Sequence, residues 1–216
     1  MTDIKACIFD LDGVIVDTAK YHFIAWRELA AELGFEFTEA HNERLKGVSR
    51  MTSLEILLEV GGITLDEEQK LKLAAQKNDR YVSYIEKMTP DEILPGVVSF
   101  LNELRLAGIK TAIGSASKNT PLILERLKLE KFFDAVIDGN KVAEAKPNPE
   151  VFLKGASELG LEPKNCIVFE DAVAGVEAAH NGGMKCVGIG FPEILTEADM
   201  VIPGFQRFNL SKLKEI

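Results

Sequence analysis

Short apolar segments alternate with stretches of helical periodicity along most of this chain, and that alternation limits its fold more than any other feature. The stretch at 95–107 is typical, because its apolar residues recur at helical spacing and Gly108 follows its end. Strands that alternate with helices form a parallel sheet covered on both faces, so each strand appears as a continuous apolar run. We therefore expect an α/β fold with a doubly wound, Rossmann-like parallel sheet, whose strands are Ala6–Asp10, Lys110–Ser115, Ala135–Asp138, Cys166–Glu170, Lys185–Gly190 and Met200–Pro203.

One long interval interrupts the alternation. The first predicted strand ends at Asp10 and the second begins near Lys110, and most of the sequence between them has helical periodicity. The helices expected there are Tyr21–Leu33, Ser49–Val60 and Asp66–Glu86, of which the last is long enough for one helix or two. We expect an α-helical domain at residues 17–89, inserted into an α/β core domain formed by residues 1–16 and 90–216.

Charge and composition exclude several classes of function. The chain has 25 Lys and Arg against 34 Asp and Glu, a net charge of −9 that argues against binding to duplex nucleic acid. Its apolar runs are too short to span a bilayer, and its N-terminal residues lack the basic and apolar regions of a secretory signal. We therefore expect a cytoplasmic protein without membrane partners, and a monomer. The three cysteines lack metal-ligand spacing, and we expect buried free thiols.

Polar residues capable of chemistry stand at or just after the ends of the first four predicted strands. Each has an ordinary structural explanation when taken alone: an acidic turn, a helix cap, a surface lysine or an acidic helix start. The arrangement as a whole is harder to explain in that way, because the carboxyl ends of parallel strands meet at one edge of a sheet, where ligands bind. The residues concerned are Asp10 and Asp12, then Ser115, then Lys146, and finally Glu170 and Asp171.

The chemistry of this set indicates phosphoryl transfer. Clustered carboxylates repel one another unless a cation neutralises them. A small set of oxygen ligands, completed by water and phosphate, suits Mg²⁺. A carboxylate, a Mg²⁺ ion and a lysine around one point suit transfer of a phosphoryl group through an aspartyl phosphate.

In the order and spacing of these four motifs, and in the helical insertion after the first, the chain resembles the haloacid dehalogenase superfamily. That resemblance implies that Asp10 is the nucleophile and Asp12 the general acid and base. It also implies that Mg²⁺ is held by Asp10, the backbone carbonyl of Asp12, Glu170 and Asp171. Ser115 and Lys146 would bind the transferring phosphoryl group, and the inserted helical domain would be a cap over the site.

Within that superfamily, the helical region and the loop after the second strand resemble the phosphosugar mutases. The resemblance implies that Arg50 and the residues at 117–119 bind the phosphate that is not transferred. It also implies that His22 and the turn at 46–49 contact the sugar and help to close the cap. The complete set of expected substrate-binding residues is Thr18, His22, Lys46, Gly47, Val48, Ser49, Arg50, Lys77, Ala116, Ser117, Lys118 and Asn119.

A physical argument supports the same prediction. A mutase must hold two phosphates at once, and an arginine opposite the sheet edge suits the second, because its guanidinium binds phosphate at two points. A closing cap also keeps water away from the aspartyl phosphate. The expected reaction interconverts β-glucose 1-phosphate and glucose 6-phosphate through β-glucose 1,6-bisphosphate.

Other interpretations of the sequence stay open. A Mg²⁺-dependent phosphatase of a small sugar phosphate or other ester has the same core and needs no second phosphate site. A protein that reuses the fold for binding alone would tolerate loss of Asp10 or Asp12, and both are present. The sequence does not identify the hexose, and it assigns no role to His41 or His180.

Overall fold

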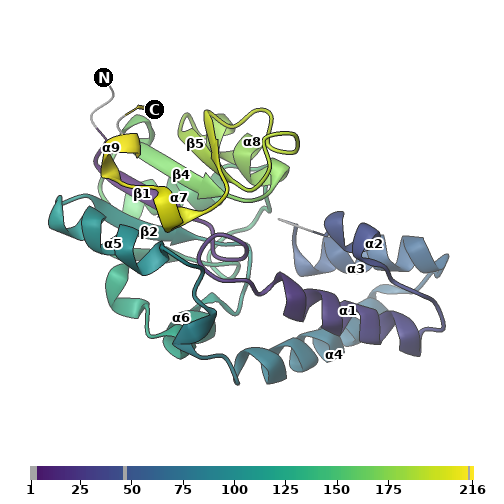
Figure 1. Ribbon diagram of the computed structural model, residues 1–216. Helices are drawn as coiled ribbons and strands as arrows, with labels where there is room; N and C mark the ends of the chain where they lie inside the picture. The colour runs from purple at the N-terminus through teal and green to yellow at the C-terminus, as the bar shows by residue number, and fades with distance from the viewer. Residues whose placement is uncertain (1–3, 46–47, 214) are drawn as a thin grey trace.

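The computed structural model describes residues 4–45, 48–213 and 215–216. At its centre is a six-stranded parallel sheet with the strand order β3–β2–β1–β4–β5–β6 (Figure 1). The strands are β1 (Ala6–Phe9), β2 (Lys110–Gly114), β3 (Ala135–Ile137), β4 (Cys166–Glu170), β5 (Lys185–Ile189) and β6 (Met200–Ile202). The predicted doubly wound α/β fold is therefore confirmed.

The register of the sheet aligns the ends of its three central strands. Phe9 of β1 lies beside Ile113 of β2 and Phe169 of β4. Just past β1, the amide of Asp10 still donates a hydrogen bond to the carbonyl of Phe169, at 2.9 Å. Five of the six predicted strands extend one residue too far at this edge, whereas β4 has its predicted bounds. Asp10, Ser115 and Gly190 each keep one backbone hydrogen bond to the sheet just past the end of a strand, which explains three of these overestimates.

Helices cover both faces of the sheet, as expected. On one face, Phe9 packs in an apolar cluster with α5 (Val97–Leu106), α6 (Thr120–Leu127) and α9 (Leu210–Leu213). On the other, Ile8 packs in a second cluster with α7 (Glu150–Glu158) and α8 (Val173–Asn181). Successive side chains of a strand point to opposite faces, so one apolar run supplies both clusters. Short 3₁₀ turns at Pro90–Glu92, Glu130–Phe132, Pro163–Asn165 and Phe205–Arg207 complete this part.

The long interval after β1 forms a group of helices beside the sheet, which we call the helical block: α1 (Ala19–Glu32), α2 (Glu39–Glu43), α3 (Arg50–Gly61) and α4 (Glu67–Ile85) (Figure 1). Trp26, Leu29 and Leu57 belong to a third apolar cluster, built from the block alone. The last predicted stretch is one helix rather than two, because α4 continues unbroken for 19 residues. The domain boundaries at residues 16 and 89 stay a prediction.

The sequence did not reveal α2, because five residues are too few to show a helical period. This helix begins with a reciprocal cap: the Thr38 amide donates to Nδ1 of His41 at 3.2 Å, and the Thr38 hydroxyl accepts from the His41 amide. His41, which had no assigned role, therefore stabilises a helix start. Nε2 of His180 lies within hydrogen-bond distance of Oδ2 of Asp199, at 2.9 Å.

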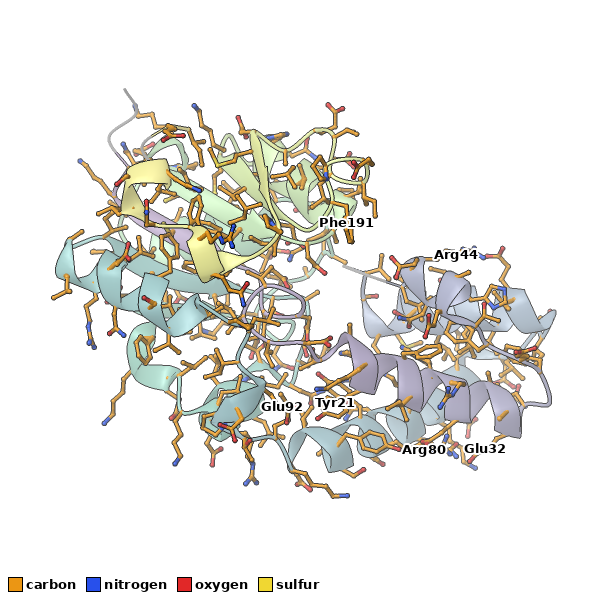
Figure 2. All side chains as sticks on the ribbon, viewed as in Figure 1. Tyr21, Glu32, Arg44, Arg80, Glu92 and Phe191 are labelled. Carbon is orange, nitrogen blue, oxygen red and sulfur yellow. The ribbon has the colours of Figure 1, made fainter. Side chains whose placement is uncertain are left out.

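Two connections join the helical block to the sheet, and they run side by side. The amide of Leu94 donates to the carbonyl of Ile15 at 2.9 Å. Tyr21, at the start of α1, donates a hydrogen bond of 2.6 Å to Glu92 in the second connection; Figure 2 labels both residues. These contacts fix the base of the block, while Arg44 of the block and Phe191 of the sheet side, both labelled in Figure 2, line one cavity farther out.

Two further expectations can be compared with the structure. The three cysteines are free and buried, as predicted, and burial raises the pKa of the Cys7 thiol. In the described part of the chain, none of the helices has the length and apolar character needed to cross a bilayer.

Candidate active site

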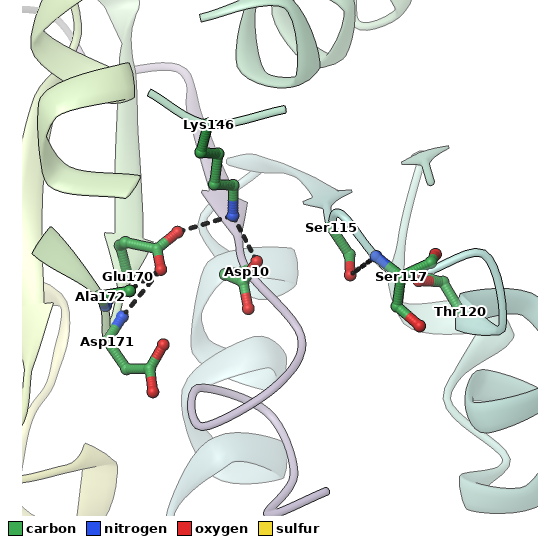
Figure 3. A network of polar contacts seen from close by, with 8 residues as sticks. All are labelled: Asp10, Ser115, Ser117, Thr120, Lys146, Glu170, Asp171 and Ala172. Atoms are coloured by element: carbon green, nitrogen blue, oxygen red, sulfur yellow. Dashed lines mark hydrogen bonds and ion pairs between the residues drawn. The ribbon is translucent and has the colours of Figure 1, made fainter. Parts of the chain in front are cut away.

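The ends of β1, β2 and β4 place the predicted catalytic residues at one edge of the sheet. Asp10 follows β1, Ser115 follows β2, and Glu170 is the last residue of β4. Strands β2 and β4 flank β1, and the chain runs outward from β1 in both directions, so this edge is the switch point at which open parallel sheets bind ligands. Figure 3 shows Asp10 and Glu170 converging on Lys146, which reaches them from the loop before α7, while Ser115 lies to one side.

Lys146 joins two carboxylates in the interior of this site. Its ammonium lies 2.5 Å from Oδ1 of Asp10 and 2.8 Å from Oε2 of Glu170, and all three side chains are buried (Figure 3). Burial is the strongest influence on the Lys146 pKa and lowers it, but the two carboxylates together outweigh burial and raise the pKa above its usual value. The lysine therefore stays charged and fixes one oxygen of Asp10.

The carboxylates at this edge form a site with the right donors for a small divalent cation. One oxygen from each of Asp10, Glu170 and Asp171 lies within 4.8 Å of the others. Burial raises the pKa of Glu170 to about 7. A bound dication would reverse that rise, because it stabilises the ionised carboxylate. Hard oxygen donors in this number suit Mg²⁺, which keeps further positions for water and phosphate.

Two glycines make room for this group of carboxylates. A Cβ atom on Gly13, whose φ is +85°, would lie 2.2 Å from Oδ2 of Asp171. A Cβ on Gly175 would lie 2.0 Å from the carboxyl carbon of Glu170. Contacts that short do not occur, so the carboxylates can gather only because both positions lack a side chain.

Asp12 is placed as a general acid and base would be. Its side chain lines the same cavity as Asp10 and accepts a hydrogen bond from the hydroxyl of Thr18. Burial raises the pKa of Asp12 to about 7, and the negative charge of Asp10 adds to the rise. A carboxyl group that titrates near neutral pH can both give and accept a proton under ordinary conditions.

The loop between β2 and α6 forms a polar wall. The hydroxyl of Ser115 accepts from the Ser117 amide at 3.1 Å, and the hydroxyl of Ser117 accepts from the Asn119 amide at 3.3 Å. Ser115 is fully buried behind this wall, whereas Ala116, Ser117, Lys118 and Asn119 line the cavity. The Asn119 amide group donates across the cavity to Asn78 of α4, at 2.9 Å.

The cavity lies between the sheet edge and the helical block and has a volume of about 490 Å³, enough for a phosphorylated sugar. Asp10, Asp12 and Glu170 line one side. From the block, His22, Val48, Ser49, Arg50 and Lys77 line the other. A larger cavity of about 980 Å³ reaches Asp171 and Phe191 but not Asp10 or Asp12, so of the two cavities the smaller one contains the predicted nucleophile and general acid.

The block contributes a second buried lysine, in surroundings unlike those of Lys146. The Lys77 ammonium is 2.8 Å from Nδ1 of His22 and lies 4.5 Å from the centre of the Trp26 ring. Burial and, to a smaller extent, the charge of Arg50 together lower the pKa of Lys77 to about 7. Burial also lowers the pKa of His22 well below its usual value, so the imidazole is neutral and accepts from Lys77.

Arg50 is the other cation on this side of the cavity. It begins α3, where Ser49 caps the helix by accepting from the Thr52 amide at 3.2 Å. Burial lowers the Arg50 pKa while the charge of Asp79 opposes that effect, and the guanidinium stays charged at neutral pH. A fixed cation that lines the cavity opposite the sheet edge is suited to bind an anion there.

The structure thus brings most of the predicted site residues into one cavity, with five exceptions, of which Ser115 and Lys146 are buried at the sheet edge and do not line it. Thr18 is buried, does not line the cavity and donates to Asp12, and its contact with substrate stays a prediction. Lys46 and Gly47 lie outside the described residues. Sequence reasoning gave no role to Asn78, which lines the cavity, or to Tyr81, whose buried hydroxyl has no hydrogen-bond partner in the described part of the chain.

Comparisons with known proteins agree with this arrangement. The haloacid dehalogenase-like hydrolase family matches residues 4–183. Among curated proteins, β-phosphoglucomutase of Bacillus subtilis is 41% identical over 213 residues, covering 98% of this chain and 94% of its own length. A phosphorylated carbohydrates phosphatase of Thermotoga maritima is 34% identical over 183 residues, covering 84% of this chain and 82% of its own. Among solved structures, β-phosphoglucomutase of Clostridium difficile superimposes with a TM-score of 0.94 at 42% identity, covering 98% of this chain and 96% of its own.

Proposed function

The chain belongs to the haloacid dehalogenase-like hydrolase family, and from this premise we propose that it is a phosphosugar mutase of the β-phosphoglucomutase type. It interconverts β-glucose 1-phosphate and glucose 6-phosphate. The observation that supports the proposal is a single cavity lined by Asp10 at the sheet edge, by Arg50 of the block and by the loop at 117–119. In the proposal, the reacting phosphate binds at Asp10 and the second phosphate binds at Arg50 and the loop.

In this proposal the first half-reaction starts from phosphorylated Asp10. The 6-hydroxyl oxygen of β-glucose 1-phosphate attacks the phosphorus, and the bond between the phosphorus and the Asp10 oxygen breaks. Asp12 takes the hydroxyl proton. The product is β-glucose 1,6-bisphosphate. Lys146 holds one oxygen of Asp10, at 2.5 Å, and so sets the direction from which the carboxylate reacts.

The second half-reaction requires the bisphosphate to turn around in the cavity. Asp10 then attacks the 1-phosphoryl group, the bond from phosphorus to the sugar oxygen breaks, and Asp12 returns its proton to that oxygen. Glucose 6-phosphate leaves, and Asp10 is phosphorylated again. Throughout, Arg50 and the loop at 117–119 bind the phosphate that is not reacting, while the helical block acts as a cap that excludes water.

Asp10, Glu170 and Asp171, with the backbone carbonyl of Asp12, would hold Mg²⁺, and the bound ion supplies positive charge beside the transferring phosphoryl oxygens. The expected partner is a small phosphosugar, and we expect the enzyme to act as a cytoplasmic monomer.

A second candidate is a phosphatase of sugar phosphates. It is favoured by the 34% identity to the phosphorylated carbohydrates phosphatase and needs only the sheet edge of the cavity. The two candidates differ in what accepts the phosphoryl group from Asp10: a sugar hydroxyl in the mutase and water in the phosphatase.

The deciding experiment incubates the protein with β-glucose 1-phosphate, Mg²⁺ and a trace of β-glucose 1,6-bisphosphate, and separates the products. We expect glucose 6-phosphate to form much faster than inorganic phosphate, and neither to form when a chelator removes Mg²⁺. Release of phosphate as the main product, with no glucose 6-phosphate, would show a phosphatase instead.

A further inference from the structure

The side chain of Asn119 is used in an unusual way at the start of α6. Asn119 occupies the position before the first helical residue, where an asparagine ordinarily accepts a hydrogen bond from its own helix. Here it makes no such cap. Its amide nitrogen instead donates to Oδ1 of Asn78 in α4, a hydrogen bond of 2.9 Å between residues 41 positions apart.

This hydrogen bond links the two sides of the cavity. Asn119 comes from the sheet side and Asn78 from the helical block, and both side chains line the cavity. Asn78 follows Lys77 directly in α4, and Arg50 of α3 lines the same wall. The pair therefore lies where the second phosphate is proposed to bind.

The hydrogen bond leaves donors for an anion. A side-chain amide nitrogen carries two hydrogens, and Asn119 uses one of them to reach Asn78. In the described residues the Asn78 amide nitrogen itself makes no hydrogen bond. Since a phosphate accepts hydrogen bonds and gives none when fully ionised, the orientation of these amides decides whether the site presents donors or a repelling oxygen.

We infer that Asn78 is a positioning residue for the second phosphate: its side-chain oxygen holds the Asn119 amide group so that the remaining N–H faces the cavity. This inference rests on the proposed function. It adds that the block contributes to the phosphate site indirectly, because Asn78 orients Asn119 of the sheet side. Placement of α4 against the loop at 117–119 then determines how well a substrate with a distant phosphate binds.

The test is Asn78→Ala, with Asn102→Ala as its matched control. Asn102 is also an asparagine within a helix whose side-chain oxygen accepts one hydrogen bond, at 2.9 Å from Arg105, but it lies in α5 and does not line the cavity. Two substrates are compared with Mg²⁺ present: β-glucose 1-phosphate and p-nitrophenyl phosphate. Hydrolysis of p-nitrophenyl phosphate does not require the second phosphate site of the protein.

We expect Asn78→Ala to raise KM for the hexose phosphate about tenfold, with a smaller change in kcat. Its effect on p-nitrophenyl phosphate should be at least about fivefold smaller, and Asn102→Ala should resemble the wild type with both substrates. In an Asn119→Ala background, Asn78→Ala should add little, because the group that it orients is gone.

Equal losses on both substrates, no loss on either, or losses that multiply in the double variant would each overturn the inference. Thermal unfolding of each variant separates a folding defect from a binding defect. If the wild type proves to be a phosphatase, the proposed mutase activity fails by itself, and the same comparison is made with hydrolysis of β-glucose 1,6-bisphosphate against p-nitrophenyl phosphate.

Discussion

The sheet edge and the helical block each bury a lysine beside the cavity, and they treat its charge in opposite ways. Lys146 lies between the carboxylates of Asp10 and Glu170, which raise its pKa above the usual value. Lys77 lies beside a neutral imidazole and two aromatic rings, and among the described residues no carboxylate comes within ion-pair distance. Its pKa is lowered to about 7, mainly by burial.

The two sides of the site therefore differ in whether the protein itself supplies an opposite charge to the buried lysine. At the sheet edge the acidic groups already hold an ammonium and have the donors for a cation. On the side of the block, Lys77 and Arg50 are positive charges that burial disfavours, and an anionic substrate would stabilise both. We therefore propose that the sheet edge carries out the chemistry and that the block recognises a particular anion.

The largest expected effect tests whether chemistry resides at the sheet edge alone. Asp10→Asn removes the proposed nucleophile while keeping the shape of the side chain. We expect both hexose phosphate interconversion and p-nitrophenyl phosphate hydrolysis to fall by at least about 10⁴-fold, as for loss of other covalent nucleophiles. The two rates are measured with Mg²⁺, alongside the unfolding temperature.

Asp138→Asn is the matched control. Asp138 is buried at the end of β3 and accepts from the Asn140 amide at 2.9 Å, but it does not line the cavity. Near-normal activity is expected for it. An Asp10→Asn protein that keeps either activity would mean that the sheet edge does not contain the nucleophile.

An intermediate effect tests whether the block recognises the second phosphate. Arg50→Ala removes one charge that faces the cavity, and hydrogen bonds to charged groups contribute about 1.5–3 kcal/mol. We therefore expect kcat/KM for β-glucose 1-phosphate to fall roughly 10- to 100-fold, and hydrolysis of p-nitrophenyl phosphate to change far less. Arg44→Ala is the control, because Arg44 is in the same block but pairs at the surface with Glu59. Equal losses on the two substrates would remove the distinction between the block and the sheet edge.

The two regions also differ in how much of them the sequence could predict. At the sheet edge, strand ends are marked by apolar runs, and a parallel sheet must bring Asp10, Ser115 and Glu170 to the same side. Nothing comparable fixes the block. The contact of Lys77 with His22 depends on how α1 packs against α4, and neither residue signals the other along the chain.

Thr18 shows the same limit at a single residue. Its position in the sequence fits a substrate contact, and no local pattern indicates that the path of the chain between β1 and α1 brings its hydroxyl to Asp12. No role could be assigned to Asn78 from the sequence for a related reason. An asparagine within a helix belongs to no recognisable sequence pattern, and the role of Asn78 depends on its hydrogen bond with Asn119.

The smallest expected effect measures the uncompensated charge of the block directly. Because Lys77 has a pKa of about 7 in the folded protein and about 10.4 when unfolded, the unfolded state binds more protons between these values. The free energy of unfolding contributed by this group therefore rises with pH from about 7 to about 10, and the cost of the buried charge is fully present below pH 7.

Lys77→Met keeps the length of the side chain and removes the charge. We expect it to stabilise the protein by about 1–2 kcal/mol near pH 6.5, less than the pKa shift alone implies because the cation–π contacts with Trp26 and Tyr81 are lost as well. The gain should be clearly smaller at pH 9, and it should reach its minimum only above about pH 10, because at pH 9 folded wild-type Lys77 is neutral while the unfolded chain still takes up a proton. Urea unfolding of the variant and the wild type at both pH values gives the difference, and Lys72→Met, an exposed position on the same helix, should show no such trend. A gain that is the same at both pH values would mean that Lys77 is not the uncompensated charge that distinguishes the block from the sheet edge.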